Sequence, residues 1–491
     1  NKKVGFWFTS RIIRPTSPLF LLTTMDTQGI SSPQYALKVD PAQGDRATEI
    51  KVCSFAKPHM RAFHFAWLGF FVAFLAWFSF APLMPKIKED IGLTADEIWV
   101  ANICSVASTI VFRFAIGPLC DRFGGRLCMA LILCTFCIPV AVGGFVVNNG
   151  TDLAIVRFFQ GVIGCVFVPC QFWTAQMFAR NVVGGAQALT GGWGNLGGGV
   201  TQIFMVGVYN MMKASTEGEM AWRSAFVIPA LVIFLVGVSM TLFAQDCPKG
   251  QYKTLQATGQ MQKTNPGSAF KQACKSADAW FLHVQYACCF GIELTINNMV
   301  VSYFYNEFGL SLETAGTIGS LFGLMNLFAR ALGGIVSDFV NKNMSGLNKN
   351  HPLRARVVAH SIILFYEGLM LIAFSQCTNL GAAIFVLLLF SLGVQMAEGT
   401  SFSIVPYVDP PVTGAISGIV GAGGNVGAVC WGMTFLYGPE KDQTVLLILG
   451  FIVMASSVLS VFLKLEHAKQ TLGQEAKELD QQEEGKEASA I

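Results

Sequence analysis

Long apolar segments alternate with short polar segments along most of the chain. Each apolar segment has about 20 residues or more, which lets a helix cross the roughly 30 Å hydrocarbon core of a membrane. Twelve such segments predict an all-α polytopic membrane protein with twelve transmembrane helices. Their predicted limits are residues 62–85, 97–119, 127–147, 152–178, 185–210, 222–244, 279–305, 313–336, 357–376, 380–405, 414–437 and 444–464.

The longest polar interruption, about 246–278, separates six predicted helices from the next six. It carries five lysines, and two other basic loops lie an even number of helices away. Positively charged loops stay on the cytoplasmic side, so the central loop and both termini are predicted to be cytoplasmic. The chain then divides into an N-terminal segment 1–60, a first six-helix half 61–245, the central loop 246–278, a second six-helix half 279–465 and a tail 466–491.

The two ends of the chain differ in composition from the apolar region. Residues 1–24 are basic and contain no acidic residue, and the chain starts with Asn1, so Met25 is a candidate initiator. A targeting segment and a stretch outside the native protein both fit this composition. The tail is rich in Glu, Gln and Lys without apolar periodicity, which predicts a disordered cytoplasmic segment.

Composition supports a membrane protein and disfavours several function classes. Hydrophobic residues make up 53% of the chain and charged residues 13%, against about 25% charged residues in soluble proteins. The net charge of +3 and the lack of a basic run argue against a nucleic-acid partner. The cysteines and histidines are scattered and no nucleotide-binding loop is present, so we predict no metal, no cofactor and no enzymatic activity. Asn149, in a predicted external loop, is a candidate glycosylation site.

An internal repeat relates the two halves. Arg113 precedes Asp121 by eight residues and Arg330 precedes Asp338 by eight, with a glycine four residues before each Asp, at Gly117 and Gly334. Two parallel six-helix repeats are typical of a secondary transporter with a site between the halves.

Two glycine-rich stretches repeat in the same way. They are "GGWGNLGGGVTQ" from Gly191 and "GAGGNVGAVCWG" from Gly421, each with an Asn in the middle, Asn195 and Asn425. Aligning the two Asn residues also aligns three glycine pairs. Glycine lets helix backbones approach closely, so these helices are predicted to slide against their neighbours. The glycines concerned are Gly191, Gly192, Gly194, Gly197, Gly421, Gly424 and Gly427.

Two short motifs carry a first resemblance. "GPLCDRFGGR" resembles the cytoplasmic loop motif of the major facilitator superfamily, and "RFFQG" from Arg157 resembles its fourth-helix motif. The resemblance implies structural and gating roles for Gly117, Asp121, Arg122, Gly124, Arg126, Asp338 and Arg157.

The two repeated arginines need a compensating charge, because a cation inside a bilayer costs at least several kcal/mol. One interpretation pairs each with a buried acid, Glu293, Glu367 or Glu398. The other places Arg113 and Arg330 across a central cavity, where two guanidinium groups clamp a small planar oxyanion.

With the glycine stretches, the arginines resemble the signatures of the nitrate/nitrite porter family, in particular the high-affinity nitrate transporters of plants and algae. The resemblance implies that Arg113, Arg330 and Asn195 bind nitrate. Tyr286 and Phe290 keep the family's Tyr-x-x-x-Phe spacing, and alignment back from Asn195 brings Phe167 onto another aromatic position. Asn425 is expected to present its amide near the anion.

The negative charge of nitrate implies that its uptake is coupled to a positive ion. Moving one negative charge into a negative-inside cell costs about 2.3 kcal/mol per 100 mV, so potential-driven uptake needs at least two protons per nitrate. Glu293 is the first candidate proton carrier and Glu398 the second, although either could be a structural partner of an arginine.

The resemblance also implies a single-span accessory subunit and a location in the plasma membrane, with the plastid envelope left open. A nitrite transporter, a nitrate/nitrite exchanger and a transporter-like nitrate sensor remain alternatives.

Overall fold

The computed structural model describes residues 35–179, 182–216, 218–259, 266–348, 353–409 and 412–466. The predictions for residues 1–24, for Met25 and for the tail beyond residue 466 lie outside the described residues.

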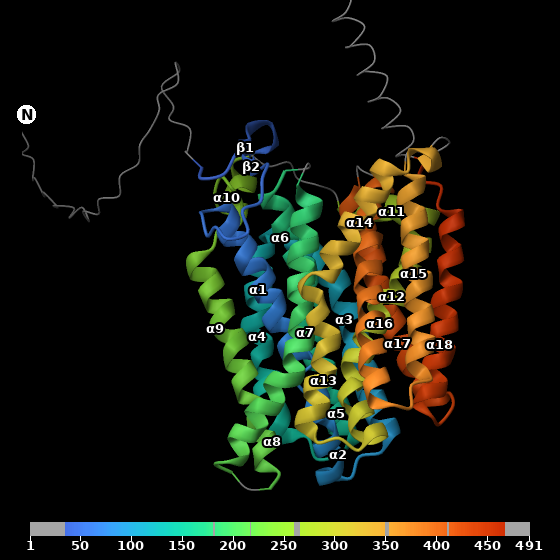
Figure 1. Cartoon of the computed structure of the whole chain (residues 1–491). Helices are drawn as coiled ribbons and strands as arrows, with labels where there is room; N and C mark the ends of the chain where they lie inside the picture. The colour runs from blue at the N-terminus through green and yellow to red at the C-terminus, as the bar shows by residue number, and fades with distance from the viewer. Residues whose placement is uncertain are drawn as a thin grey trace, which may run out of the picture. The chain divides into compact units, whose positions relative to one another are not determined.

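Helices form nearly all of the described chain (Figure 1). In the first half the segments are α1 (His59–Trp77), η2 (Ala81–Leu83) and α2 (Met84–Ile91), α3 (Ala95–Phe123), α4 (Gly125–Val146), α5 (Gly150–Gly161), η3 (Val162–Val166) and α6 (Phe167–Met177), α7 (Val183–Lys213), then α8 (Met220–Ala225) and α9 (Val227–Phe243). In the second half they are α12 (Ala277–Phe308), α13 (Leu312–Leu324), η4 (Met325–Leu327) and α14 (Ala329–Asn343), α15 (Arg354–Ser375), α16 (Leu380–Ile404) with η6 (Val405–Tyr407), α17 (Thr413–Tyr437), and α18 (Asp442–Ser456) with η8 (Ser457–Phe462). A further short turn, η5 (Ser345–Asn348), follows α14.

Eleven of the twelve predicted spans meet criteria of length and apolar composition in the described part of the chain. The twelfth is α7, which is 31 residues long, or about 46 Å at 1.5 Å per residue. Its glycines and buried amides lower its hydropathy, yet it runs through the bundle beside α1 and α13 (Figure 1). The twelve-helix prediction is therefore confirmed, with α7 as a polar, buried member.

The packing of helices repeats between the halves. In the first half α1 packs along α7, α3 along α5 and α4 along α9. In the second half α12 packs along α17, α14 along α16 and α15 along α18. Counted along each half, the first span pairs with the fifth, the second with the fourth and the third with the sixth. The pairing is the same in both halves, as the sequence repeat predicts. The two halves meet where α7 packs on α13 and α17 packs on α3.

Backbone atoms come very close where α7 packs on α13. A Cβ added to Gly199 of α7 would lie 2.5 Å from the carbonyl carbon of Gly323 in α13. A Cβ added to Gly316 would lie 2.8 Å from the carbonyl oxygen of Gln202. Because real Cβ atoms do not approach this closely, the helices can pack at this distance only with glycine at these positions.

The polar segments contain structure that the apolar pattern did not predict. The strands β1 (Val39–Asp40) and β2 (Arg46–Ala47) form a two-stranded antiparallel sheet, with the short turn η1 (Pro41–Gln43) between them. Ala47 of β2 pairs with Phe178, directly after α6. The central loop holds two short helices, α10 (Tyr252–Ala257) and α11 (Pro266–Ala273).

Helix α10 anchors the loop motif that follows α3. Arg126 forms an ion pair with Asp246 at 3.0 Å. Burial raises the pKa of Tyr252 to about 12, so its hydroxyl stays protonated and donates to the backbone oxygen of Asp121 at 3.1 Å. The central loop is thus fastened to the predicted gating motif.

Two substitutions in α7 test the glycine contact. Gly199→Ala should destabilise the protein by roughly 1–3 kcal/mol, the usual cost of overpacking, because the added methyl group meets the backbone of α13. Gly207→Ala is the control, since nothing lies within 4 Å of a Cβ there, and it should be neutral or stabilising by up to about 1 kcal/mol. Thermal unfolding of the two purified variants measures the difference. Equal melting temperatures would contradict the close contact.

Candidate substrate site between the two halves

Arg113 is buried where α3 meets α17, and its acceptors are backbone oxygens. Its Nη1 donates to Gly421 at 3.0 Å and its Nη2 donates to Gly164 at 3.3 Å. The side chain is 8% exposed, and Nε has no partner among the described residues. None of the described carboxylates forms an ion pair with it. Arg113 is therefore a buried cation with donor capacity to spare.

Arg330, its repeat counterpart, has a different set of partners. Its Nη1 forms an ion pair with Glu398 of α16, and its Nη2 donates to the hydroxyl of Tyr286 at 2.9 Å. The interpretation that pairs the arginines with buried acids thus holds for Arg330 in this structure and does not hold for Arg113.

Asn195 of α7 joins two of the buried acids. Its Nδ2 lies 3.3 Å from Glu293 and 3.4 Å from Glu398, while Nδ2 of Asn326 donates to Glu293 at 2.8 Å. The Oδ1 atom of Asn195 has no partner among the described residues. An amide from the first half thus binds two carboxylates of the second half, and Glu398 connects them to Arg330.

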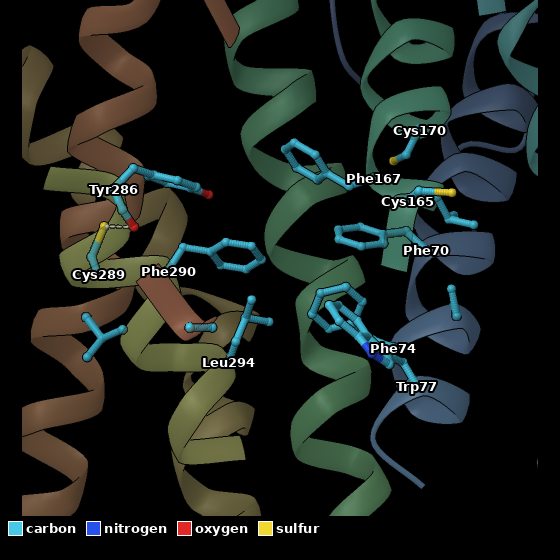
Figure 2. Close-up of a cluster of buried hydrophobic side chains, with 14 of the residues drawn as sticks. Phe70, Phe74, Trp77, Cys165, Phe167, Cys170, Tyr286, Cys289, Phe290 and Leu294 are labelled. Carbon is cyan, nitrogen blue, oxygen red and sulfur yellow. Dashed lines mark hydrogen bonds between the residues drawn. The ribbon is translucent and has the colours of Figure 1, made fainter. Parts of the chain in front are cut away.

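Aromatic rings surround both guanidinium groups. The Cζ atom of Arg113 lies 5.1 Å from the ring centroid of Phe167 and 6.0 Å from that of Phe290, and Cζ of Arg330 lies 5.7 Å from that of Phe402. Such cation–π contacts stabilise a buried cation without neutralising it. Figure 2 shows Tyr286 and Phe290 on one side and Phe167 on the other, with their rings directed toward one another.

Each glycine stretch contacts the arginine of the opposite half. A Cβ at Gly191 would lie 3.6 Å from Nε of Arg330, and one at Gly192 would lie 3.4 Å from the Cβ of Arg330. Gly421 supplies its carbonyl oxygen to Arg113, and a Cβ there would lie 3.5 Å from the ring of Phe167. The other predicted glycines pack tightly: Gly194 on Phe70, Gly197 on the backbone of Phe71, Gly424 on Phe290 and Gly427 on Ala287.

Other predicted residues form no hydrogen bond or ion pair with this cluster. Asn425 is fully buried, and neither of its amide atoms has a hydrogen-bond partner among the described residues, so no hydrogen bond links it to the arginines. Asp338 pairs with Arg356 at 2.5 Å at the end of α14. Arg122 lies over its neighbour Phe123 at 5.2 Å. Gly117 and Gly334 have no atom within 4 Å of an added Cβ.

Three residues of the cluster escaped the sequence analysis: Phe70, Asn326 and Phe402. Phe402 contacts the rings of Phe167 and Tyr286, with centroids 6.2 and 5.2 Å apart. Phe402 lies four residues after Glu398, on the same helix face. This spacing is the sequence feature that could have indicated its place in the cluster. Phe70 lies 5.6 Å from Phe167 between ring centroids. Because the chain has 41 Phe residues, residue type alone could not identify Phe70 or Phe402 as members of the cluster.

Comparisons with known proteins agree with this architecture. The model of the Major Facilitator Superfamily matches residues 66–432. The chain belongs to this superfamily of transporters. A solved bacterial homolog of the human lysosomal transporter Spinster, in an inward-facing and unoccupied conformation, matches with a TM-score of 0.59 at 14% identity, over 84% of this chain and 98% of that one, which supports the fold alone.

Curated relatives narrow the family. The chain is 38% identical to high affinity nitrate transporter 2.5 of Arabidopsis thaliana, over 87% of this chain and 83% of the relative. It is 36% identical to nitrate transporter 2.1 of Chlamydomonas reinhardtii, over 86% and 76%. It is 26% identical to the nitrate/nitrite transporter NrtP of Picosynechococcus, over 75% and 83%. It is thus a member of the nitrate transporter family within the superfamily, and not an enzyme.

Arg157 of this major facilitator chain is a further buried cation, at another level of the bundle. Its Nη1 donates to the backbone oxygen of Trp77 at 2.8 Å and to Gln160 at 3.1 Å. Its Nη2 donates to Asn102 at 2.9 Å and to Asn298 at 2.7 Å. All of these acceptors are neutral.

Of the four acceptors, Asn298 alone belongs to the second half. Asn102 lies eleven residues before Arg113 on α3, which is about 16 Å along the helix, toward the end of the bundle opposite α10 and α11 (Figure 1). Arg157 therefore joins the halves at a level distinct from that of Arg113.

Substitutions of Asn298 and Asn102 test whether the hydrogen bond between Arg157 and Asn298 resists separation of the halves. Asn298→Asp turns the bond to Arg157 into an ion pair across the halves, and we expect transport turnover to fall about tenfold, as for roughly 1.4 kcal/mol of added barrier. Asn102→Asp adds the same charge beside the same Nη2 atom within one half and should leave turnover within about twofold. Substrate uptake per surface-expressed protein measures both. Equal slowing of the two variants would contradict a role in holding the halves together.

Proposed function

We propose that this protein imports nitrate by alternating access, with Arg113 and Arg330 as the residues that hold the anion. The observation that supports this most directly is the pair of buried guanidinium groups, one from each half, of which one has a carboxylate partner. The similarity to nitrate transporters of Arabidopsis and Chlamydomonas supports nitrate as the substrate.

The partners of the two arginines suggest how the anion enters. Nitrate binding at Arg113 needs no acid to leave, because Nε is unpartnered and the other donors hold only backbone oxygens. At Arg330 the anion has to replace the carboxylate of Glu398, which occupies the oxyanion position of the guanidinium. Nitrate is flat and weakly hydrated, so rings such as Phe167 and Phe290 can face it while the arginines hold its oxygens.

The exchange at Arg330 couples nitrate to a proton. An ionised Glu398 released from Arg330 would be an uncompensated charge in an apolar interior, which costs several kcal/mol. A proton on Glu398 removes that cost, so proton binding and nitrate binding favour each other. Asn195 contacts both Glu398 and Glu293, so the two acids respond together. We assign the first coupling proton to this acid pair.

Nitrite is a second candidate substrate, because NrtP of Picosynechococcus is a nitrate/nitrite transporter and a bent two-oxygen anion can use the same donors. We also propose the plasma membrane as the location and a single-span accessory subunit as a partner. Expression with and without such a subunit, followed by surface labelling, tests both. The cytoplasmic placement of the termini and glycosylation at Asn149 stay predictions.

Conservative substitution of the arginines tests the clamp. Arg113→Lys and Arg330→Lys each keep the charge but lose the fork that grips two oxygens, so nitrate affinity should fall about tenfold or more, equivalent to at least roughly 1.4 kcal/mol. Arg61→Lys, at the start of α1 and outside the cluster, is the control and should behave as wild type. Nitrate-evoked current in oocytes and nitrate binding to purified protein are the measurements. Unchanged affinity in both site variants would exclude the clamp.

Glu398→Gln tests the exchange. In the wild type nitrate binding should strengthen as the pH falls, because protonation of Glu398 releases Arg330. The glutamine variant carries no charge to release, so its nitrate affinity should be as high at pH 7.5 as at pH 5.5. Binding isotherms at the two pH values decide this. A wild-type pH dependence that survives in Glu398→Gln would refute the exchange at Arg330. Nitrate transport without current would favour a nitrate/nitrite exchanger. Nitrate binding without transport would favour a sensor.

A further inference from the structure

Glu367 of α15 is a buried acid that the proposed exchange does not use. It is 0% exposed, and neither carboxylate oxygen has a hydrogen-bond partner among the described residues. Glu293 and Glu398 differ from it in this respect, since amide or guanidinium donors reach each of them. The sequence analysis offered Glu367 as a partner for an arginine, and the structure excludes that role, because neither Arg113 nor Arg330 contacts it.

The surroundings of Glu367 leave little room for a counter-charge. A Cβ added to Gly393 of α16 would lie 3.1 Å from the Cα of Glu367, and one added to Gly368 would lie 2.5 Å from the backbone nitrogen of Met454 in α18. Helix α15 is therefore packed closely against both neighbours at this level. No described Lys or Arg forms an ion pair with Glu367.

The titratable groups near Glu367 are carboxyl groups, thiols and one histidine. Glu293, Cys288 and Cys289 of α12 and Glu398 of α16 are close enough to interact with it electrostatically. On its own helix, His360 lies seven residues earlier and bonds to Thr400 at 2.8 Å. Glu293 interacts with both Glu367 and Glu398, so the three carboxylates form one electrostatic group contributed by α12, α15 and α16.

At this position the protonated carboxyl group has a lower free energy than the ionised carboxylate. Burying an ionised carboxylate without a partner costs several kcal/mol, so Glu367 holds a proton in this conformation. The neutral acid is still left with an unpaired hydroxyl group, which costs about 1–3 kcal/mol. The proton stays bound in this conformation because the ionised form has no partner, so its release requires a conformation in which water or a donor reaches the carboxyl group.

We propose that Glu367 is a second proton-binding site, separate from the anion site, that supplies the second coupling charge. The proposal rests on the proposed nitrate import, in which the proton on the Glu398 and Glu293 pair only cancels the charge of nitrate. Inward current then needs one more positive charge per cycle. Glu367 takes a proton from the external solution and releases it on the cytoplasmic side, so two protons and one nitrate move one net positive charge.

The ratio of charge to nitrate tests this. Integrated current and labelled nitrate uptake, measured together in oocytes, should give about one positive charge per nitrate for the wild type. Glu367→Gln should bind nitrate with unchanged affinity and still transport it, but with a ratio near zero, because one proton remains per cycle. Glu398→Gln is the matched control, since it removes the pH dependence of nitrate binding, which Glu367→Gln should keep.

The outcomes separate the two proposals. A ratio in Glu367→Gln equal to that of the wild type overturns the second proton site and leaves nitrate import standing. Absence of wild-type nitrate transport overturns the import proposal itself. Should Glu367→Gln fail to reach the surface, Glu367→Met, which keeps a similar volume without a proton-binding group, takes its place: a ratio near zero supports the second site and a ratio equal to that of the wild type overturns it. Wild-type nitrate uptake that carries no net charge overturns the second site as well.

Discussion

Two guanidinium groups, Arg113 and Arg330, are buried between the halves of a membrane protein, where lipid and apolar side chains offer no acceptors. Each must find oxygen atoms within the protein or lose several kcal/mol. Arg113 finds two backbone carbonyls and two aromatic rings, and Arg330 finds Glu398 and Tyr286. The asymmetry matters, because one cation keeps its charge uncompensated while the other is neutralised by a group that can accept a proton.

The glycine stretches follow from the same constraint. Side chains partly shield a helical carbonyl, and a residue without Cβ opens the approach to it for a long cation. Gly421 does this for Arg113, and Gly191 and Gly192 make room for Arg330. Each stretch serves the arginine of the opposite half, so any rotation of one half against the other changes the environment of both cations together. In the proposed mechanism, this crossing of contacts links alternating access to substrate binding.

Polar groups between the helices carry the coupling further. Asn195 binds two acids of the other half, and Arg157 reaches Asn298 of the other half at a second level. In each of these contacts one partner is a neutral amide, so the contact breaks at less cost than an ion pair in an apolar medium. A transporter that has to separate its halves in every cycle is well served by such bonds.

The sequence by itself determined the number of helices, their order and the repeat, because hydropathy and residue spacing are local properties that lipid enforces directly. It also identified both arginines, Asn195 and the rings of Tyr286, Phe290 and Phe167, through repeat positions and family resemblance. Only the tertiary structure decided that Glu398 pairs with Arg330, that Phe402 joins the aromatic cluster, and that Asn425 and Glu367 have no hydrogen-bond partner among the described residues. These outcomes depend on distances between helices that are far apart in the chain, and a pattern along one helix carries no information about which face of another helix it meets.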